Sequence, residues 1–341
     1  MLAVVVGGFF GDEGKGKICA YLSLADKVKV SVRTGSVNAG HTVVYKGREY
    51  KLRIIPSAFV NKEARLLIAP GANLRLDVFF SELKELECFN IKNRVGIDQH
   101  CSIVERRHVE EEMANEHLTK KIGSTRQGVG AAVRDRVMRV ARLAEDIEEL
   151  KEFITDVPSE IQKALSRGDN VLIEGTQGTF LSLYHGTYPY VTSRDTTASG
   201  VCSEAGIGPK DVDEVVIVFK SYVTRVGAGP LEGELPLEEA RRRGLLEYGT
   251  VTGRPRRVAP FNFELAKRAV LLNSATQIAL TRVDSLEPSC RGIREYSKLP
   301  KSIKEFIEKI EDYLKIPVSI ISTGPEVEHT IDRRKDLGLL R

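Results

Sequence analysis

The chain has 341 residues, 42% hydrophobic and 29% charged, a balance that supports a sizeable core and excludes intrinsic disorder as the main state. Lys and Arg number 51 against 47 Asp and Glu, so the net charge of +4 suits an anionic partner without identifying one. No apolar run approaches the ~18 residues of a membrane-spanning helix, and five scattered cysteines indicate reduced thiols in a cytoplasmic protein rather than a metal site.

Apolar runs of strand length alternate with helical patterns along the chain. Strands are expected at 2–7, 28–33, 66–69, 95–97, 170–174, 214–220, 277–281 and 318–322, with a hairpin over 42–52. Helices are expected at 18–24, 74–88, 259–273 and 302–314. Because buried parallel strands read as near-continuous apolar runs, the pattern predicts an α/β fold with a mostly parallel central sheet and helices on both faces. We expect one large domain over residues 1–341, with small excursions and with ligands at the carboxyl ends of the strands.

A glycine-rich segment, residues 7–17 (GGFFGDEGKGK), follows the first strand and opens the first helix. Glycine amides and a helix N-terminus bind anions, and the two lysines add positive charge. Residues 11–17 match the phosphate-binding pattern G-x-x-x-x-G-K. The next residue is Ile18 rather than a Ser or Thr that would bind magnesium, so Asp12 is the candidate Mg²⁺ ligand within the loop. An ordinary charged surface turn remains an alternative for this segment taken alone.

Three segments resemble signatures of the adenylosuccinate synthetase family. They are Gly11-Asp12-Glu13-Gly14-Lys15-Gly16-Lys17, Asn38-Ala39-Gly40-His41-Thr42, and Asp195-Thr196-Thr197 after residues 186–193. The resemblance implies a P-loop-NTPase-like fold and the GTP-dependent ligation of L-aspartate to IMP through a 6-phosphoryl-IMP intermediate. The products would be adenylosuccinate, GDP and phosphate, with Mg²⁺ as cofactor and a homodimer as the active unit.

The resemblance implies two catalytic residues. Asp12 is the general base that removes the N1 proton of IMP and is also a Mg²⁺ ligand, and the Gly40 carbonyl is the second ligand. His41 is the matching general acid. A single histidine near glycines is more often a polar loop residue, but Asn38 and Gly40 beside it favour the catalytic role. The other five histidines receive no role, and His100, His108 and His117 are expected on the solvated surface.

The same resemblance implies three sets of substrate-binding residues. Those for IMP are Asp12, Glu13, Gly14, Lys15, Asn38, Ala39, Gly40, His41, Thr125, Arg139, Gln177, Thr192 and Arg254. Those for GTP are Gly11, Asp12, Glu13, Gly14, Lys15, Gly16, Lys17, Gly40, His41, Thr42, Arg256, Arg282, Val283, Asp284, Ser322, Thr323 and Gly324, with guanine loops at 281–284 and 322–325. Those for aspartate are Thr250, Val251, Thr252, Gly253, Arg254, Pro255 and Arg256.

Side-chain chemistry agrees with these assignments. Glycines and hydroxyls over 123–130 suit a phosphate nest. Arginine forks such as Arg254 and Arg256 bind carboxylates and phosphates bidentately. The carboxylate of Asp284 can accept from both N1–H and the 2-amino group of guanine, which adenine lacks. Arg139 aligns with an arginine that the neighbouring subunit donates, although it could be one more arginine of a basic stretch.

The chain departs from the family pattern in three places. Arg282 replaces the usual Lys before the guanine-binding aspartate, Phe9-Phe10 replaces Gln-Trp, and the chain is shorter than most of the family. The alternative function is a GTP-binding switch or regulatory NTPase that hydrolyses GTP without IMP. A nucleic acid is not expected as a partner, because the arginine cluster at 254–257 lacks interleaved aromatics. A membrane is not expected either, because no apolar run is long enough to span one.

Overall fold

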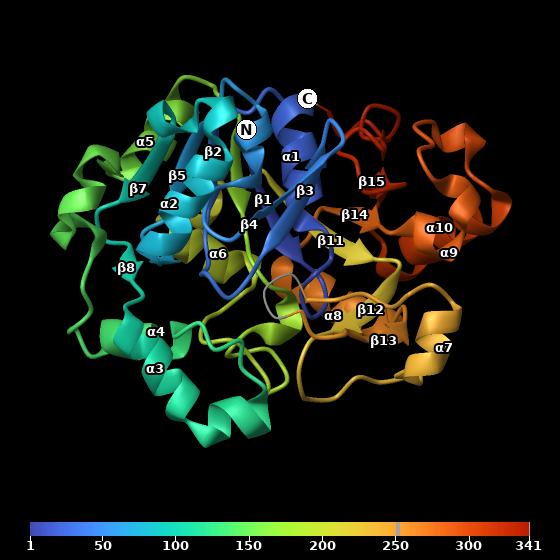
Figure 1. Cartoon of the computed structure of the whole chain (residues 1–341). Coiled ribbons are helices and arrows are strands. Elements are labelled where there is room, and N and C mark those ends of the chain that lie inside the picture. The colour runs from blue at the N-terminus through green and yellow to red at the C-terminus, as the bar shows by residue number, and fades with distance from the viewer. Residues whose placement is uncertain (250–252, 341) are drawn as a thin grey trace.

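A ten-stranded sheet runs through the middle of the molecule (Figure 1). The computed structural model describes residues 1–249 and 253–340. The sheet strands are β1 (Leu2–Gly7), β2 (Val30–Arg33), β5 (Arg65–Ile68), β7 (Val95–Asp98), β9 (Ile154–Thr155), β10 (Val171–Glu174), β11 (Glu214–Lys220), β14 (Gln277–Thr281), β15 (Val318–Ser322) and β16 (Thr330–Asp332). Their order is β16-β15-β14-β11-β1-β10-β2-β5-β7-β9, and the described neighbours are parallel except for β15 and β16.

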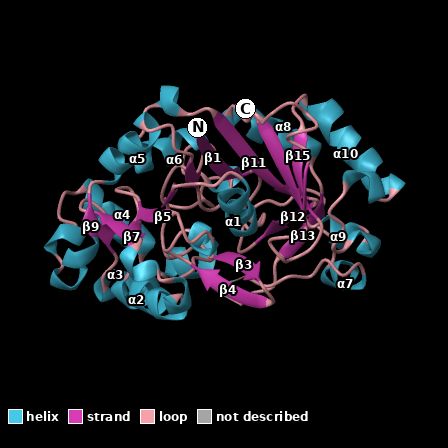
Figure 2. Ribbon diagram, turned by 90° about the horizontal axis from the view of Figure 1, so that it is seen from above, coloured by secondary structure: helices cyan, strands magenta, loops and turns pink. Residues whose placement is uncertain are grey.

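Helices cover both faces of the sheet (Figure 2). They are α1 (Lys15–Ala25), α2 (Leu76–Glu85), α3 (Arg106–Ala114), α4 (Val129–Val137), α5 (Val157–Ser166), α6 (Ala198–Ala205), α7 (Leu237–Arg242), α8 (Phe263–Asn273), α9 (Val283–Leu286) and α10 (Lys301–Leu314). The first strand shows the cause: Leu2, Val4 and Val6 pack in a core with α5, α6, α8 and α10, whereas Ala3 and Val5 pack with α1. Alternate residues of a strand face opposite sides, so an all-apolar strand requires cover on both.

Three two-stranded sheets lie outside the main sheet. They pair β3 (His41–Tyr45) with β4 (Arg48–Leu52), β6 (Asn73–Leu74) with β8 (Ser102–Ile103), and β12 (Tyr222–Arg225) with β13 (Arg257–Pro260). The β3–β4 hairpin lies against α1, and β12 and β13 continue below the carboxyl end of β11 (Figure 1). These excursions surround the edge of the sheet at which parallel strands end.

The predicted fold class is confirmed, and the strands expected at 2–7, 214–220, 277–281 and 318–322 have those bounds. The expected helix over 259–273 is wrong at its start, because residues up to Pro260 belong to β13 and pair with β12. The helix begins at Phe263, where the side chain of Asn262 accepts from the amide of Leu265 at 2.9 Å. In the described ranges, no helix is long and apolar enough to cross a bilayer.

The surface position expected for His108 is also wrong. This histidine is fully buried between α3 and α4. Its Nε2 lies 3.1 Å from Oδ2 of Asp135, and its Nδ1 accepts from the amide of Glu105 at 3.0 Å. Nε2 therefore joins α3 to α4, and Nδ1 caps the N-terminus of α3. His100 and His117 are exposed as expected.

Candidate active site

A cavity of about 400 Å³ lies at the carboxyl ends of the central strands. Its lining brings together side chains from distant segments that the sequence assigned to IMP. They are Asp12, Lys15, Asn38, Ala39, Gly40, His41, Thr125, Gln177, Thr192 and Arg254. Of the other residues assigned to IMP, Glu13, Gly14 and Arg139 do not line this cavity. Its volume suits a ligand of nucleotide size.

The glycine-rich loop after β1 takes its shape from two glycines and one buried carboxylate. Gly14 has φ of 90° and precedes α1, a left-handed conformation that favours glycine. A Cβ on Gly16 would lie 2.8 Å from that of His41, so this glycine lets β3 approach α1. Glu13 turns inward and accepts from the amide of Gly11 at 2.8 Å and from Nζ of Lys15 at 2.8 Å. The Glu13 carboxylate therefore shapes the loop. Only the backbone of Glu13 remains for the nucleotide contacts that the sequence predicts.

Three polar side chains form one hydrogen-bonded group on the cavity wall. Nε2 of Gln177 donates to Oδ1 of Asn38 and to Oγ1 of Thr192, each at 3.3 Å. Nδ2 of Asn38 donates to the same Oγ1 at 3.5 Å. Gln177 holds φ of 57° to reach this position, a backbone conformation that is uncommon outside glycine and is found often at functional sites.

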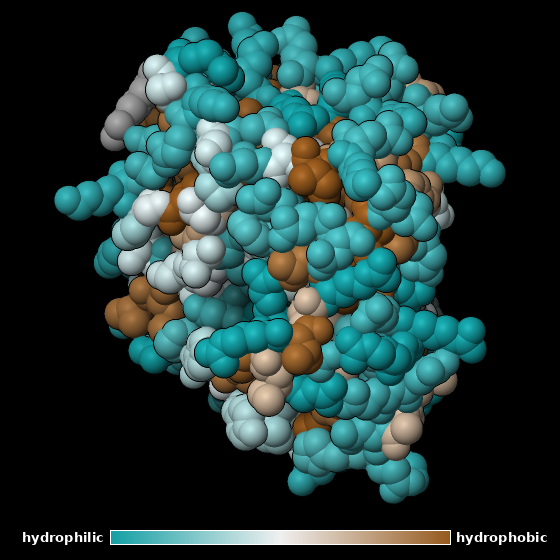
Figure 3. All heavy atoms as spheres, turned by 90° about the vertical axis from the view of Figure 1, so that its left-hand side faces the viewer, coloured by the Kyte–Doolittle hydropathy of each residue, from teal (hydrophilic) through white to brown (hydrophobic). Residues whose placement is uncertain are grey.

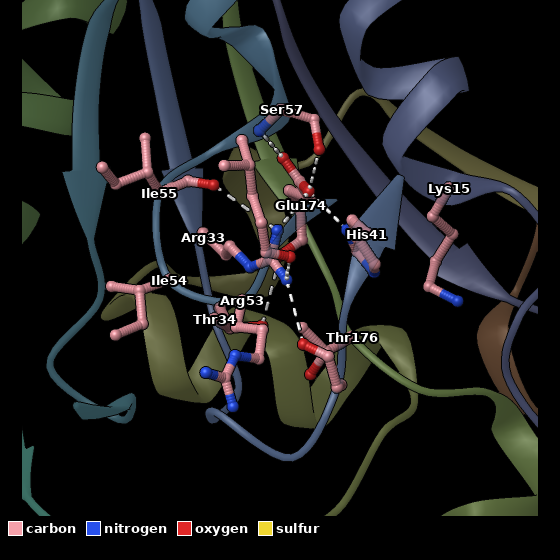
Figure 4. A network of polar contacts seen from close by, with 12 residues as sticks. Lys15, Arg33, Thr34, His41, Arg53, Ile54, Ile55, Ser57, Glu174 and Thr176 are labelled. Atoms are coloured by element: carbon pink, nitrogen blue, oxygen red, sulfur yellow. Dashed lines mark hydrogen bonds and ion pairs between the residues drawn. The ribbon is translucent and has the colours of Figure 1, made fainter. Parts of the chain in front are cut away.

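His41 is held by a buried carboxylate at the end of β10 (Figure 4). Glu174 accepts from Nδ1 of His41, from Nη1 of Arg33 at 3.1 Å, and from the amide and hydroxyl of Ser57, both at 2.7 Å. Burial opposes ionisation of Glu174, but Arg33, His41 and Ser57 outweigh it and lower its pKa. An ionised carboxylate only accepts, so the hydrogen of neutral His41 lies on Nδ1.

The second ring nitrogen of His41, Nε2, is available to react with a ligand. Nε2 is buried and has no hydrogen-bond partner among the residues that the structure describes, and His41 lines the cavity. Burial and then the charge of Arg33 lower the pKa of His41 to about 4, against the raising effect of Glu174. His41 is therefore neutral at pH 7 in the ligand-free chain, with the Nε2 lone pair unused.

We expect His41 to remain neutral at pH 5.5 and to titrate near pH 4, because a buried ring beside Arg33 resists a second proton. An unfolded histidine has a pKa near ~6.5, so the unfolded chain binds a proton between these values that the folded chain does not. Stability is therefore lost as the pH falls from about 6.5 to about 4. An NMR titration of the histidine rings, with His41→Asn to assign the signal, measures this. A midpoint above pH 6 for that signal would contradict it.

Asp12 lies in the loop opposite His41 and faces an arginine. It holds φ of 61° and is partly exposed to the cavity. Nε of Arg256 lies 3.0 Å from Oδ2 of Asp12, as an ion pair rather than an aligned hydrogen bond. The predicted phosphate-binding arginine and the predicted base are therefore neighbours.

The residues assigned to GTP gather on the other side of this loop. Nζ of Lys17 donates to Oγ of Ser322 at 2.6 Å and to the carbonyls of Gly324 and His329 at 2.6 and 2.7 Å, so it ties α1 to the loop after β15. Oδ1 of Asp284 is buried without a partner in the described ranges. That oxygen suits a donor such as guanine N1–H, because a buried acceptor left unpaired is costly.

Residues 250–256, which the sequence assigns to L-aspartate, form the aspartate loop, and the structure describes the residues on both of its stems. Arg254 lines the cavity and donates to the carbonyl of Gly123 at 2.9 Å, which joins this loop to the predicted phosphate nest. The amide of Gly249 donates to the carbonyl of Arg254 at 2.8 Å, and the amide of Arg256 donates to that of Glu247 at 2.8 Å. Thr250, Val251 and Thr252 lie outside the described residues.

Sequence reasoning missed two carboxylates and one arginine of this region. Glu174 and Glu247 hold predicted site residues, and Arg225 lines the cavity while its guanidinium stacks 4.4 Å from the ring centre of Phe10. Burial lowers the pKa of Arg225 to about 10. The available signal was a charged residue ending an otherwise apolar strand, as Glu174 ends β10.

A magnesium site would have few protein ligands. In the described ranges, no three His, Cys, Asp or Glu side chains gather in a metal-binding group. Asp12 and Gly40 line the same cavity and offer one carboxylate and one carbonyl. Mg²⁺ takes oxygen ligands and usually retains waters and substrate phosphates around one or two carboxylates, so this donor set fits.

Comparisons with known proteins show which family the chain is similar to. A family model described as adenylosuccinate synthetase matches residues 4–148, 140–289 and 285–331. A curated adenylosuccinate synthetase of Pyrococcus horikoshii is 54% identical over 332 residues, covering 97% of this chain and 98% of its own. That of Methanocaldococcus jannaschii is 54% identical over 335 residues, covering 98% and 97%. The fully ligated adenylosuccinate synthetase structure from Plasmodium falciparum has a TM-score of 0.89, 26% identity, and coverage of 97% and 99%.

Proposed function

The chain belongs to the adenylosuccinate synthetase family, and on that premise we propose that its cavity binds IMP and that Asp12 and His41 catalyse the GTP-dependent addition of L-aspartate to IMP. The products are adenylosuccinate, GDP and phosphate. One observation carries the assignment of the site. Asp12, His41 and the Asn38–Gln177–Thr192 group come from separate segments and line one cavity of nucleotide size.

The ligation proceeds in two displacements at named atoms. Asp12 takes the proton from N1 of IMP, and the electron pair moves to the 6-oxygen, which attacks the γ-phosphorus of GTP. The bond from that phosphorus to the β,γ-bridging oxygen breaks, leaving GDP and 6-phosphoryl-IMP. The neutral amine of L-aspartate then attacks C6, the bond from C6 to the 6-oxygen breaks, and the phosphate that leaves takes the proton given up by the amine. Phosphorylation is needed because the carbonyl oxygen is a poor leaving group.

The polar side chains stabilise charge that develops during these steps. Glu174 keeps Nδ1–H of His41 turned away, so Nε2 is directed to the transferred phosphoryl group. A nearby phosphoryl anion raises the pKa of His41 and allows Nε2 to carry a proton and donate it. Arg256, beside Asp12, neutralises the GTP phosphates. Arg254 binds the carboxylates of L-aspartate through bidentate hydrogen bonds. Mg²⁺, held by Asp12 and the Gly40 carbonyl, would add positive charge to the GTP phosphates when bound.

Arg139 lies apart from the cavity of its own chain. It follows α4 and is exposed. Its neighbours Val137, Met138 and Val140 are 68%, 64% and 65% exposed. The face of the molecule in Figure 3 is mostly hydrophilic, with apolar side chains in small groups. Large apolar side chains grouped on a surface mark an interface. They support a homodimer in which the partner's Arg139 reaches IMP.

Mixing two inactive variants, Arg139→Leu and Asp12→Asn, is expected to restore activity. In a mixed dimer, one site keeps Asp12 and receives an intact Arg139 from the other chain. Statistical exchange makes half of the dimers mixed with one good site each, so about a quarter of the unchanged activity is expected. Each variant alone is the control. No recovery, with exchange verified by a tag on one chain, counts against the role in trans.

The proposed function is tested by one assay with GTP, IMP, L-aspartate and Mg²⁺ that follows phosphate release and the absorbance of the product. Phosphate release that requires both IMP and L-aspartate supports the ligase. Release that ignores them favours the GTP-binding switch, which the comparisons do not support. The single domain over 1–341 and the cytoplasmic location stay predictions.

A further inference from the structure

One buried carboxylate, that of Glu247, joins two arginines assigned to GTP to the stem of the loop assigned to L-aspartate. Its Oε2 accepts from Nζ of Lys220 at 2.9 Å and from Nη1 of Arg256. Its Oε1 lies 2.9 Å from Nη2 of Arg282 and accepts from the hydroxyl of Tyr222. The side chain of Glu247 is only 9% exposed. Four donors therefore converge on two oxygens that solvent hardly reaches.

The four donors come from four separate elements. They lie at the end of β11, in β12, directly before β13 and directly before α9, all in the right half of Figure 1. The backbone of Glu247 belongs to the first stem of the aspartate loop, opposite Arg256, and Tyr248 pairs with Pro255. A shift of the stem therefore moves the carboxylate that the other elements share.

The positive charges around Glu247 can lie close together only because its carboxylate is ionised. Burial opposes its ionisation, but Lys220, Arg282 and Arg256 outweigh burial and hold the pKa of Glu247 far below its usual range. Three cations in so small a volume repel one another, and Glu247 offsets that repulsion. Because Arg256 also ion-pairs with Asp12, a row of alternating charges runs from the proposed base to the guanine loop.

We propose that Glu247 is a positioning residue that couples the binding of GTP to the binding of L-aspartate, an inference that rests on the proposed function. GTP that engages Arg256 and Arg282 fixes their common partner, and with it the stem of the loop that carries Arg254. Arg254 is then already in place when L-aspartate arrives, which lowers the entropic cost of binding. Linkage requires L-aspartate to tighten GTP binding by the same factor.

The test is Glu247→Gln, which keeps the shape and removes the charge. Calorimetry with IMP and Mg²⁺ present measures the Kd of L-aspartate with and without a non-hydrolysable GTP analogue. In the unchanged chain, the analogue is expected to lower that Kd about tenfold, a usual size for coupling between sites. The coupling ratio is the Kd of L-aspartate without the analogue divided by the Kd with it. In Glu247→Gln, this ratio is expected to fall to within about twofold of one. A purely structural role would lower the melting temperature and leave the ratio unchanged.

Glu239→Gln is the matched control, because Glu239 lies nearby on α7 and pairs with the surface arginines Arg242 and Arg243. It is expected to keep the ratio of the unchanged chain. A folded Glu247→Gln protein that also keeps this ratio overturns the inference. Failure of the unchanged chain to ligate would instead reject the proposed function.

A second variant covers the case in which Glu247→Gln does not fold. Arg282→Gln removes one donor from Glu247 at a side chain that is 44% exposed, so the fold should tolerate it. It is expected to weaken GTP binding and to reduce the coupling ratio as well. A ratio equal to that of the unchanged chain in this folded variant also overturns the inference.

Discussion

Asp12→Asn is expected to lower kcat for adenylosuccinate formation by about 10³-fold and to leave the fold intact. The amide cannot take the N1 proton of IMP, and it removes the negative partner that lies 3.0 Å from Nε of Arg256. Asn keeps the shape of the side chain. It also tolerates the left-handed backbone at φ of 61°, which alanine would strain.

Steady-state phosphate release at saturating substrates measures the loss, and calorimetry with IMP shows whether the cavity still binds. Asp77→Asn is the control, because Asp77 also pairs with an arginine, Arg75, but does so at the surface. It should retain full activity. If Asp12→Asn keeps more than about a tenth of kcat, a value too high for loss of a general base, Asp12 is not the base.

The central strands could be predicted because their signal is local. β1, β11, β14 and β15 are buried on both faces and mainly apolar, so each reads as a near-continuous apolar run with clear ends. β13 was missed because Val258-Ala259 merges with the apolar residues of the helix that follows. The strand exists because β12, more than thirty residues earlier, offers it an antiparallel partner.

The residues of the site also fall into a group that could be predicted from the sequence and a group that could not. Asp12, Asn38 and His41 lie in short motifs, so their approach to one cavity was predictable from the family resemblance. The partners that orient them were not, because the order of the sheet decides them. β10 inserts between β1 and β2, and the parallel register sets Glu174 beside Arg33 at the strand ends. That pairing joins residues 141 positions apart, which no local pattern encodes.

His108 shows how one pairing reverses an interpretation. Its segment is rich in charge and is expected on the solvated surface, yet the ring is buried in contact with Asp135 of α4. Arg107 and Arg134 also pair with Asp135 and cover it. A charged sequence therefore became a buried contact, because the partner charge lies on another helix.

Glu174→Gln is expected both to destabilise the chain and to lower kcat at least about a hundredfold, the size expected for disabling a general acid. Glu174 is fully buried and is the acidic partner of Arg33. Removing one charge of a buried pair costs about 3–5 kcal/mol, because the other charge is left uncompensated. The amide also brings a donor to a place where the amide of Ser57 already donates.

The catalytic loss has a separate cause. With an amide at position 174, either face can turn to His41, so the ring is no longer held with its hydrogen on Nδ1. The pKa of His41 should fall further, because Glu174 raises it. Nε2 would then rarely carry the proton that the phosphoryl group needs. The NMR signal of the His41 ring reports this change directly.

Glu82→Gln separates the loss of stability from the loss of kcat, because Glu82 is also a buried carboxylate of this region. It accepts from the amides of Arg53, Ile54 and Ile55 and does not contact His41. This control should lose stability, since an amide cannot satisfy all of these donors, but it should keep kcat and the His41 signal. Equal stability losses with unequal kcat would assign the excess to the imidazole. A Glu174→Gln chain that keeps kcat would reduce Glu174 to a counterion for Arg33.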